Sequence, residues 1–246
     1  ILVNSNDGML KIYQYQPSNS NNPYALKFNY IAGAAQRENG RRIIQDLQGR
    51  AHKKYGETSN PHLYFGNGDM SQLTSPRGQN VVVSTLGQGG KGAFALNVSG
   101  VEDANTSVKV GLDVTGVANW KDSVPLWDTS AKVKSGSSAS VISDMGYTIG
   151  RPAIDLVALK RSNDEKKAPV ILGDDADVRM VAFVANGYEA TTKPTLHIID
   201  AIGSKMKLDG AVGNNSVGQV LKTFVLDSNT IGIDVADKTA LSCPTV

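Results

Sequence analysis

Cysteine is almost absent from this chain: Cys243 is the single one among 246 residues. This excludes an internal disulfide, a zinc site built on paired cysteines and a redox dithiol. Long apolar runs are missing too, since no stretch approaches the ~20 residues of a membrane-spanning helix. No charged segment followed by an apolar one precedes the first strand-like run, which begins at Ile1. We therefore expect a piece of a longer polypeptide, for which the missing signal peptide does not argue against export.

An excess of charge of one sign is also lacking. The chain has 25 Lys and Arg against 23 Asp and Glu, a formal net charge of +2. Neither nucleic acid nor an anionic membrane surface is therefore indicated as a partner. The exception is local: residues 37–54 hold six basic and two acidic side chains. We interpret this segment as a solvated face, and Arg41 to Lys54 within it is the best helix candidate.

What the chain does have is a recurring pattern of a short apolar strand, a turn rich in Asn, Asp and Gly, and a second short strand. The turns of the three clearest hairpins lie at Asn4–Gly8, at Gly87–Gly92 and from Asn186-Gly187 onward. Such hairpins predict an all-β fold, specifically a β-propeller with long loop insertions and at most one or two short helices. We expect one propeller domain over residues 1–246, or a fragment of one, with about five blades at most.

The glycine-rich turn allows a second interpretation, because Gly87 to Gly92 has the spacing of a phosphate-binding G-x-G-x-x-G loop. That motif needs a helix after it, so that the helix N-terminus faces the phosphate. The following residues, AFALNV, have a strand period and no helix cap. The loop is therefore predicted to be a tight β turn without chemistry.

Two polar stretches interrupt the pattern. Gly100 to Asp144 contains both tryptophans, Trp120 and Trp127, and we expect most of it to be surface loop. Pro17 to Pro23 includes SNSNN and is predicted to be an irregular excursion after the first hairpin.

Several short motifs occur in an order that resembles a known family. The chain is similar, over roughly residues 1 to 205, to the C-terminal β-propeller of the type IV pilus biogenesis factors and tip-associated adhesins of the PilY/PilC type. Lys11 stands where that family commonly has His, and Asn97 where it has Asp. The motifs that carry the resemblance are NDGML (Asn6–Leu10), PHLYF (Pro61–Phe65), LGQGGKGAFALNVSG (Leu86–Gly100), PLW (Pro125–Trp127), MGYTIGRP (Met145–Pro152), NGY (Asn186–Tyr188) and LHIIDAIG (Leu196–Gly203).

The resemblance implies a quinoprotein-like propeller of an exported protein, at the pilus tip, the outer cell surface or the periplasm of a Gram-negative bacterium. The family has no known catalytic function, and its propeller is associated with pilus extension and retraction, surface attachment and twitching motility. The implied partners are minor pilins or the pilus tip complex. A host or surface receptor would be bound through an adhesive region outside these residues.

Residues inside the motifs are predicted to have structural roles. Gly146 and Gly150 would allow close backbone approach before Arg151-Pro152 ends a strand. For His62, Tyr64, Tyr147 and Tyr188 the preferred interpretation is a buried ring with a satisfied polar tip, against a role in contacting a ligand.

One metal site is implied by the resemblance, because members of the family often carry an EF-hand-like calcium loop downstream of the NGY turn. Asp227, Asn229 and Asp234 are the candidate ligands here, with Gly232 at the sharp turn. Ile231 stands where a third oxygen ligand is expected, and Asp237 is the alternative closing acid. A degenerate loop that has lost calcium stays an open alternative.

No catalytic site is predicted. The acidic cluster Asp174, Asp175 and Asp177 is interpreted as solvated surface charge. The three histidines lie in different contexts, without a G-x-S-x-G elbow or a metal-spaced pair. Two alternatives to the adhesin stay open: a quinoprotein-type dehydrogenase propeller, suggested by the DGMLKIY and ALNV hairpins, and a propeller that scaffolds an envelope complex.

Overall fold

The structure, a computed structural model, describes residues 1–5, 7–33, 57–58, 64–74, 80–98, 101–102, 109–110, 124–130, 141–158, 178–205 and 217–227. Within these ranges the regular structure is antiparallel strand, apart from one 3-10 turn, η2 (Gly87–Gly89). The first sheet holds β1 (Leu2–Asn4), β2 (Leu10–Tyr15) and β3 (Tyr24–Tyr30). The middle sheet holds β4 (Met70–Thr74), β5 (Asn80–Thr85), β6 (Ala93–Asn97) and β9 (Pro125–Asp128). The third sheet holds β10 (Ala153–Ala158), β11 (Val178–Ala185), β12 (Thr195–Lys205) and β13 (Val220–Val225), and a separate small pair is formed by β7 (Val101–Glu102) and β8 (Lys109–Val110).

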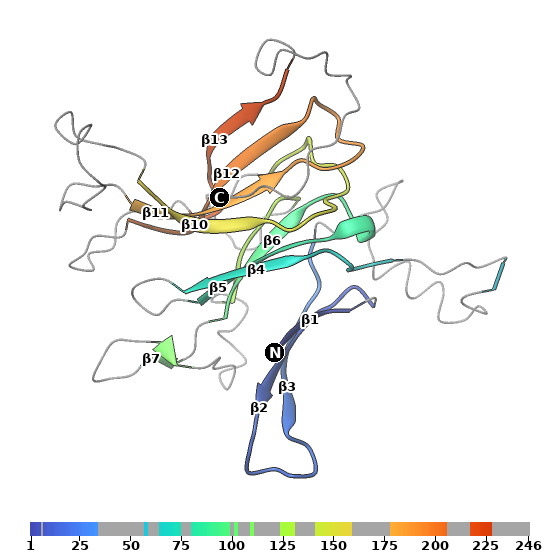
Figure 1. The fold of residues 1–246 in the computed structure, drawn as a ribbon, viewed down its shortest axis with the longest axis vertical. Coiled ribbons are helices and arrows are strands. Elements are labelled where there is room, and N and C mark those ends of the chain that lie inside the picture. Colours follow the sequence, from blue (N-terminus) through green and yellow to red (C-terminus); the bar gives the residue numbers. More distant parts are fainter. Residues whose placement is uncertain are drawn as a thin grey trace.

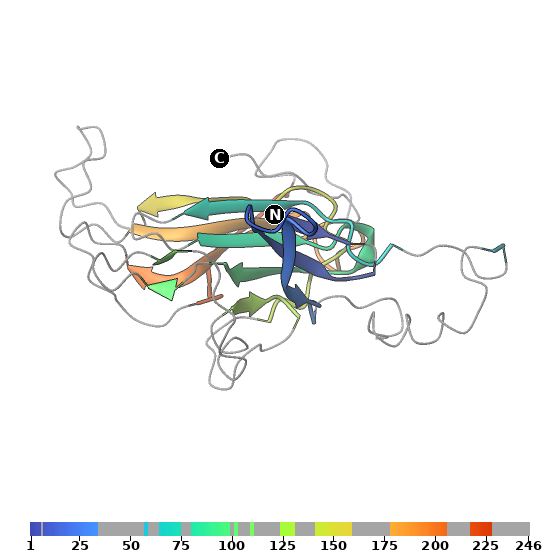
Figure 2. The same cartoon turned by 90° about the horizontal axis from the view of Figure 1, so that it is seen from below.

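The three main sheets follow one another in space as they do along the chain. Figure 1 shows the first sheet below the middle one and the third sheet above it, and in Figure 2, seen from below, the first sheet (blue) lies in front of the other two. Inside each sheet the strands are antiparallel neighbours in chain order. The first strands of the middle and third sheets, β4 and β10, contact each other. Consecutive antiparallel sheets with adjoining first strands are the blades of a propeller, so the predicted all-β propeller fold is confirmed.

Both faces of the middle sheet are buried. Val82 on β5 and Phe94 on β6 belong to the core shared with the first sheet. Their neighbours Val81, Val83 and Ala95 belong to the core shared with the third sheet. Because strand side chains alternate between faces, a strand buried on both sides reads as a continuous apolar run. This explains the uninterrupted Val81-Val82-Val83 of the sequence.

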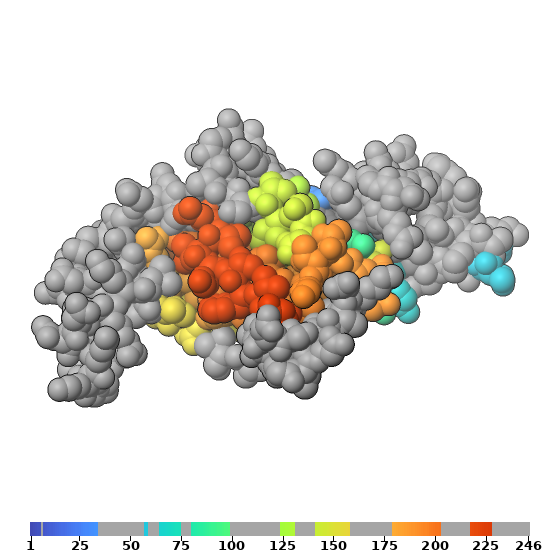
Figure 3. All heavy atoms as spheres, turned by 90° about the horizontal axis from the view of Figure 1, so that it is seen from above, coloured from blue at the N-terminus to red at the C-terminus, as the bar shows by residue number. Residues whose placement is uncertain are grey.

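The outer sheets each turn one face toward this middle layer. Leu10, Ile12 and Phe28 of the first sheet pack on it from one side. From the other side come Met180, Ala182, Val184, Ile199 and Ala201 of the third sheet. Figure 3 shows β13 (red), the last strand of the third sheet, at the surface beside the orange β12 region. Phe224 and Val225 at the end of β13 are about half exposed.

The three predicted hairpins are confirmed as β1–β2, β5–β6 and β11–β12. Strand β6 follows the glycine-rich turn, as expected for a β turn rather than a phosphate loop. Residues 17–23 form the exposed connection between β2 and β3. The helix candidate Arg41 to Lys54, His62, the acidic cluster at 174–177 and Cys243 lie outside the described residues.

Two expectations are wrong. Pro125 to Asp128, placed within a stretch expected to be mostly surface loop, is strand β9, and Trp127 on it is 1% exposed. Its register against β6 sets Trp127 opposite Ala95, where the small alanine leaves room for the indole against the third sheet. Arg151-Pro152 does not end a strand but directly precedes β10. A proline has no N–H to give to a ladder, so it suits the entry of a strand.

Candidate interaction surface at the turn end of the sheets

The predicted hairpin turns gather at one end of the molecule, which we call the turn end. It comprises the turns 5–9, 86–92 and 186–194, together with two linkers, 64–69 before β4 and 145–152 before β10. The turn 86–92 carries η2, visible at the right of Figure 1. Strands β6, β10 and β12 start at the turn end and finish at the opposite end of their sheets.

The second linker is clamped between the turn of the middle sheet and the turn of the third. Thr148 does this with one side chain: its Oγ1 accepts the Leu86 N–H at 3.1 Å and donates to Gly92 O at 2.5 Å. Its carbonyl oxygen accepts the Gly87 N–H at 3.2 Å. On the other side Tyr147 exchanges two backbone hydrogen bonds, of 2.6 and 2.9 Å, with Tyr188. The two sheets are thus joined through buried, satisfied polar groups, which hold the linker in one position.

The first linker repeats this arrangement between the first and middle sheets. Asn4 on β1 donates from Nδ2 to Gly68 O at 2.6 Å, and Asn67 Oδ1 accepts the Gln88 N–H at 2.9 Å. Gly89 of the middle turn lies so close that an added Cβ would overlap the Phe65 carbonyl. Gly146 meets Tyr188 O in the same way at the next junction. These positions need glycine because a neighbouring backbone occupies the side-chain space.

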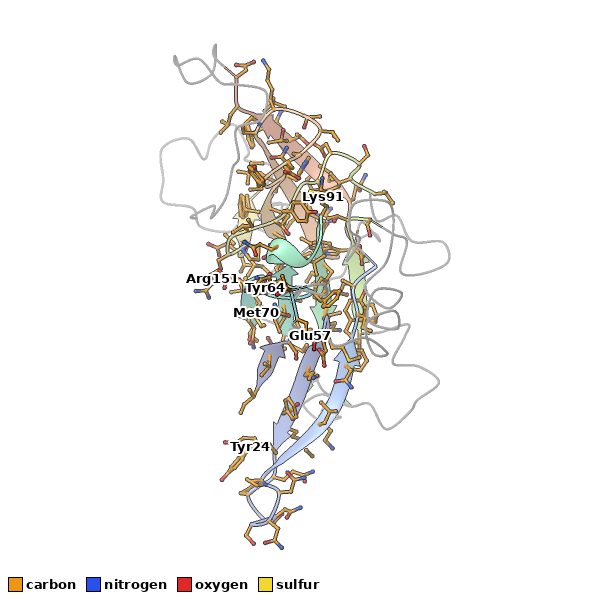
Figure 4. The ribbon with its side chains drawn as sticks, turned by 90° about the vertical axis from the view of Figure 1, so that its right-hand side faces the viewer. Tyr24, Glu57, Tyr64, Met70, Lys91 and Arg151 are labelled. Carbon is orange, nitrogen blue, oxygen red and sulfur yellow. The ribbon has the colours of Figure 1, made fainter. Side chains whose placement is uncertain are left out.

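Large side chains stand exposed on this rigid frame. Tyr64 is 48% exposed, Ile149 46% and Tyr188 50%. Lys91 lies with Nζ 5.0 Å from the centroid of the Tyr147 ring, and the same nitrogen donates to Glu189 O at 3.3 Å. Figure 4, which faces this end, shows Tyr64 and Lys91 on the viewer's side. We call this set the aromatic patch: Tyr64, Lys91, Tyr147, Ile149 and Tyr188.

The expectation of buried rings is therefore wrong for Tyr64 and Tyr188. Both have the backbone role that the motif pattern indicated, since each lies in a linker or turn clamped by hydrogen bonds. The hydrogen bonds that hold these segments involve their main-chain groups, and the rings of Tyr64 and Tyr188 project into solvent. An apolar run beside glycine predicts a tight turn, but not which way its side chains point.

A basic side chain borders the aromatic patch. Arg151 is exposed and anchored by its Nε, which donates to Ser71 Oγ on β4 at 3.0 Å. Ser71 in turn donates to the Pro152 carbonyl at 2.5 Å. The guanidinium is labelled at the edge of the view in Figure 4. An arginine whose stem is fixed while its head faces solvent is suited to contact a partner.

At the first turn, Asp7 and Lys11 form a partly buried ion pair of 2.5 Å, with Lys11 at the position where the resembled family has His. Partial burial acts to raise the pKa of Asp7, but hydrogen bonds from Lys11, the Met9 N–H and Ser5 outweigh it and lower that pKa. The hydrogen bond from Asp7 raises the pKa of Lys11. Lys11 therefore takes part in holding the turn.

One histidine is buried between the middle and third sheets. His197 on β12 has Nε2 3.3 Å from Asp144 Oδ1 and Nδ1 3.4 Å from Thr223 Oγ1. Thr192 donates to the other Asp144 oxygen at 2.9 Å. Burial lowers the pKa of His197, and Asp144 opposes this only in part. The imidazole is therefore neutral at pH 7 and lies between the second linker and the edge strand β13.

A buried ion pair lies on the other face of the third sheet. Arg179 Nη1 is 2.7 Å from Asp200 Oδ2, and both side chains are buried. It joins β11 to β12 where their register shifts. A buried pair of this kind fixes register more than it adds stability, because each charge must be desolvated.

Only one of the three predicted calcium ligands lies among the residues that the structure describes. Asp227 follows β13 and is partly buried, whereas Asn229 and Asp234 lie outside the described residues. In the part of the chain that the structure describes, no three His, Cys, Asp or Glu side chains come together as a metal site. Calcium binding stays a prediction. Across the same ranges, no helix has the length and apolar character needed to cross a membrane.

Comparison with known proteins identifies the family of this chain. A family model described as the PilY1 beta-propeller domain matches residues 1–201. The chain belongs to the PilY1 propeller family. It shares 16% identity with the chain titled "Crystal structure of Pseudomonas aeruginosa PilY1 C-terminal domain", with a TM-score of 0.42. That match covers 95% of this chain and 31% of the solved one, so this chain spans less than a third of the solved chain. No curated protein sequence shows a significant match.

Membership of the PilY1 family has consequences for the class of function. The family is of the adhesin type and is not a family of enzymes. It is associated with the type IV pilus machinery, and its location is pilus-associated, at the cell surface or in the periplasm. The resemblance carried by the ordered short motifs is thereby confirmed.

Proposed function

We propose that this chain is part of the propeller of a longer exported protein at the pilus tip, outer surface or periplasm of a Gram-negative bacterium. It supports pilus extension and retraction, and through them surface attachment and twitching motility, without catalysing a reaction. Its partners are minor pilins or the pilus tip complex. A host or surface receptor is bound by a region outside these residues.

The observation that carries this proposal is the aromatic patch on its hydrogen-bonded frame. Tyrosine and arginine are enriched among the residues that dominate protein interfaces. The tyrosine ring buries a large area at low entropic cost, and the guanidinium offers several hydrogen-bond donors. Loops bind selectively when a rigid scaffold supports them. Here Ile149 and Tyr188 project from segments whose backbone is hydrogen-bonded to neighbouring segments, and Tyr64 begins the linker that is held at Asn67 and Gly68. Thr148 and Gly89 provide that support without facing a partner.

Binding of purified minor pilins to the chain tests the proposal. Replacing Tyr64 and Tyr188 together by Ser is expected to weaken binding about 30-fold, since a pair of hot-spot side chains accounts for about 2 kcal/mol or more. The matched control is Tyr15→Ser, a tyrosine on the first sheet that is at least as exposed as the other two. Loss of binding in the control but not in the double variant would place the interface elsewhere. A stoichiometric quinone absorbance in the purified protein would instead support a dehydrogenase.

Calcium is the second part of the proposal, with Asp227, Asn229 and Asp234 as ligands. Oxygen ligands of this type suit calcium, and each lost carboxylate weakens a site that is already short of donors. Calorimetric titration with calcium is expected to show one site that Asp234→Asn abolishes. The control Asp69→Asn removes an exposed carboxylate before β4 and leaves the titration unchanged. No heat of binding in the unaltered chain would contradict a filled loop.

A further inference from the structure

A polar network runs from the buried His197 to the turn 186–194. Nε2 of the imidazole lies 3.3 Å from Oδ1 of Asp144, which directly precedes the second linker. Thr192 in the turn donates to the other Asp144 oxygen at 2.9 Å, and Asn186 donates from Nδ2 to Thr192 Oγ1 at 3.4 Å. One carboxylate therefore contacts the imidazole with one oxygen and holds the turn with the other.

The same turn and linker position half of the aromatic patch. Tyr188 lies in the turn, and its backbone exchanges two hydrogen bonds with Tyr147 of the second linker. The carbonyl oxygen of Glu189, next to it, accepts a hydrogen bond from Lys91 Nζ at 3.3 Å. Tyr64 lies in the first linker, which is held instead by the first and middle sheets. A movement of the turn relative to the second linker would therefore displace Tyr188 and leave Tyr64 in place.

The imidazole is buried with few polar contacts. His197 is 5% exposed, and among the described residues its Nε2 has no hydrogen-bond partner, because Asp144 is not oriented to accept from it. Nδ1 makes one long contact, of 3.4 Å, with Thr223 Oγ1 on β13. The cover over the ring is thin, since Asp144 is partly exposed and β13 is an edge strand at the surface (Figure 3). A small displacement of these neighbours would bring water to the ring.

Asp144 is the charged group that faces the ring in the described part of the chain. The register partners of His197 on β11 and β13 are the uncharged Val184 and Thr223. Lys222, next to Thr223, lies on the opposite face of β13.

Strand β9 and the turn add no second charge at the ring. β9 contacts β12 and turns Trp127 toward the third sheet. Its neighbour Asp128 lies on the other face, where burial and the Asp128 charge raise the pKa of Tyr30. Glu189 and Lys193 of the turn are exposed. The charge of the site is therefore set by the imidazole and by the one carboxylate beside it.

Protonation of this ring favours its hydration. Burial lowers the pKa of His197, and Asp144 offsets the effect only in part, so the buried ring takes up a proton less readily than a solvated one. By linkage, a proton then favours the arrangement in which the ring reaches water. Carboxylates ordinarily titrate near pH 4, so between about pH 7.5 and 5.5 the imidazole is the group of the pair that responds.

We propose that His197 makes partner binding at the aromatic patch pH-dependent: when the imidazole takes up a proton, the turn 186–194 loosens from the second linker and Tyr188 loses its fixed position. Tyr64 is unaffected. This rests on the proposed function, under which the patch binds a partner. The patch is in its binding form at neutral pH, and an acidic environment weakens it.

Amide hydrogen exchange of the full-length protein tests the loosening without any partner. Between about pH 7.5 and 5.5, after correction for the intrinsic pH dependence of exchange, the amides of 186–194 are expected to lose protection about threefold or more. The amides of 64–69 in the first linker are the internal control and keep their protection. Unchanged protection of the turn overturns the proposal, and so does an equal loss in both segments.

Two variants assign the effect to the imidazole. His197→Gln is expected to abolish the loss of protection, because glutamine does not titrate. Asp144→Asn keeps an acceptor for Thr192 and is expected to enlarge the loss, because the carboxylate that offsets burial of the charged ring is gone. Asp69→Asn, at an exposed carboxylate before β4, is the matched control and leaves the loss unchanged. A loss that persists in His197→Gln, or that shrinks in Asp144→Asn, contradicts the proposal.

Binding of purified minor pilins at the same two pH values connects the loosening to function. The affinity is expected to fall about threefold or more at the lower pH for the unaltered protein, and to stay level for His197→Gln. Equal falls in both proteins would place the pH dependence in the pilin or elsewhere and overturn the inference. Absence of binding at either pH would overturn the proposed function, whereas the exchange measurement decides the loosening on its own.

Discussion

The middle sheet and the first sheet have similar strands but different surroundings. The middle sheet is covered on both faces, and its β5 reads NVVVST, with no polar alternation. The first sheet is covered on one face, and its β2 reads LKIYQY, where buried residues alternate with partly or fully exposed ones. In this protein the pattern of apolar and polar residues along a strand therefore indicates whether one or both of its faces are covered.

The largest effect should come from the middle sheet. Trp127→Ala removes a side chain that is 1% exposed and is expected to destabilise the chain by about 3–5 kcal/mol, from lost burial and the cavity left behind. Tyr15→Ala on the first sheet should cost about 0.5 kcal/mol or less in the same chain. Urea unfolding of both variants measures the difference. Similar losses for the two would break the contrast between the sheets.

The next effect concerns the clamp between the middle and third sheets. Thr148→Val keeps the shape of the side chain but leaves the Leu86 N–H and the Gly92 carbonyl without its hydroxyl. Because both groups are buried, we expect a loss of about 2–4 kcal/mol. Thr74→Val, at an exposed position on β4, is the matched control and should be near neutral. A neutral Thr148 variant would show that the linker is not held by this hydroxyl.

A smaller effect is expected at the junction of the first and middle sheets. Gly89→Ala would bring a Cβ against the Phe65 carbonyl, and the backbone must shift to relieve the overlap. We expect a cost of about 1–3 kcal/mol, as for other overpacked positions. Gln88→Ala, at the exposed neighbouring position, should leave the unfolding midpoint in place. Tolerance of alanine at 89 would mean that the two sheets are less closely joined than the first linker indicates.

The smallest effect is a pH dependence. Burial places the pKa of His197 in the folded chain below its value of about 6.5 in the unfolded chain. The unfolded state therefore takes up the proton first, and stability is lost as the pH falls below about 6.5 until the folded-state pKa is reached. Unfolding free energies at pH 7.5 and 5.5 should differ more for the unaltered chain than for His197→Gln. An equal change in both chains would assign the acid sensitivity to other groups.

Turn chemistry accounts for how much of the fold could be predicted. Gly87, Gly92 and Gly187 adopt positive φ, a backbone conformation that few other residues take up, so those hairpins can be predicted from the sequence. Strand β9 could not be predicted from the sequence, because its four residues lie between polar stretches and are too few to show an alternating apolar pattern. Its strand state comes from pairing with β6, a contact distant in the chain. Tertiary contacts of this kind override local patterns.

Only part of the candidate surface could be predicted from the sequence, for a related reason. Motif order identified the family and the linker 145–152, but the outward rings of Tyr64 and Tyr188 depend on which side of the frame the main chain occupies. The family resemblance implies a calcium loop with Asp227, Asn229 and Asp234 as ligands, and only Asp227 falls among the described residues. Spacing along a chain says little about convergence in space.

The threading of residues 145–150 between two successive turns has a consequence for how the molecule can be divided. Thr148 completes the turn of the sheet that precedes it in the chain, so cutting between β9 and β10 would leave each half with exposed hydrogen-bonding groups. A single blade is therefore not an autonomous module that can be excised or transplanted. The smallest exchangeable unit is a sheet together with the linker that enters the next one.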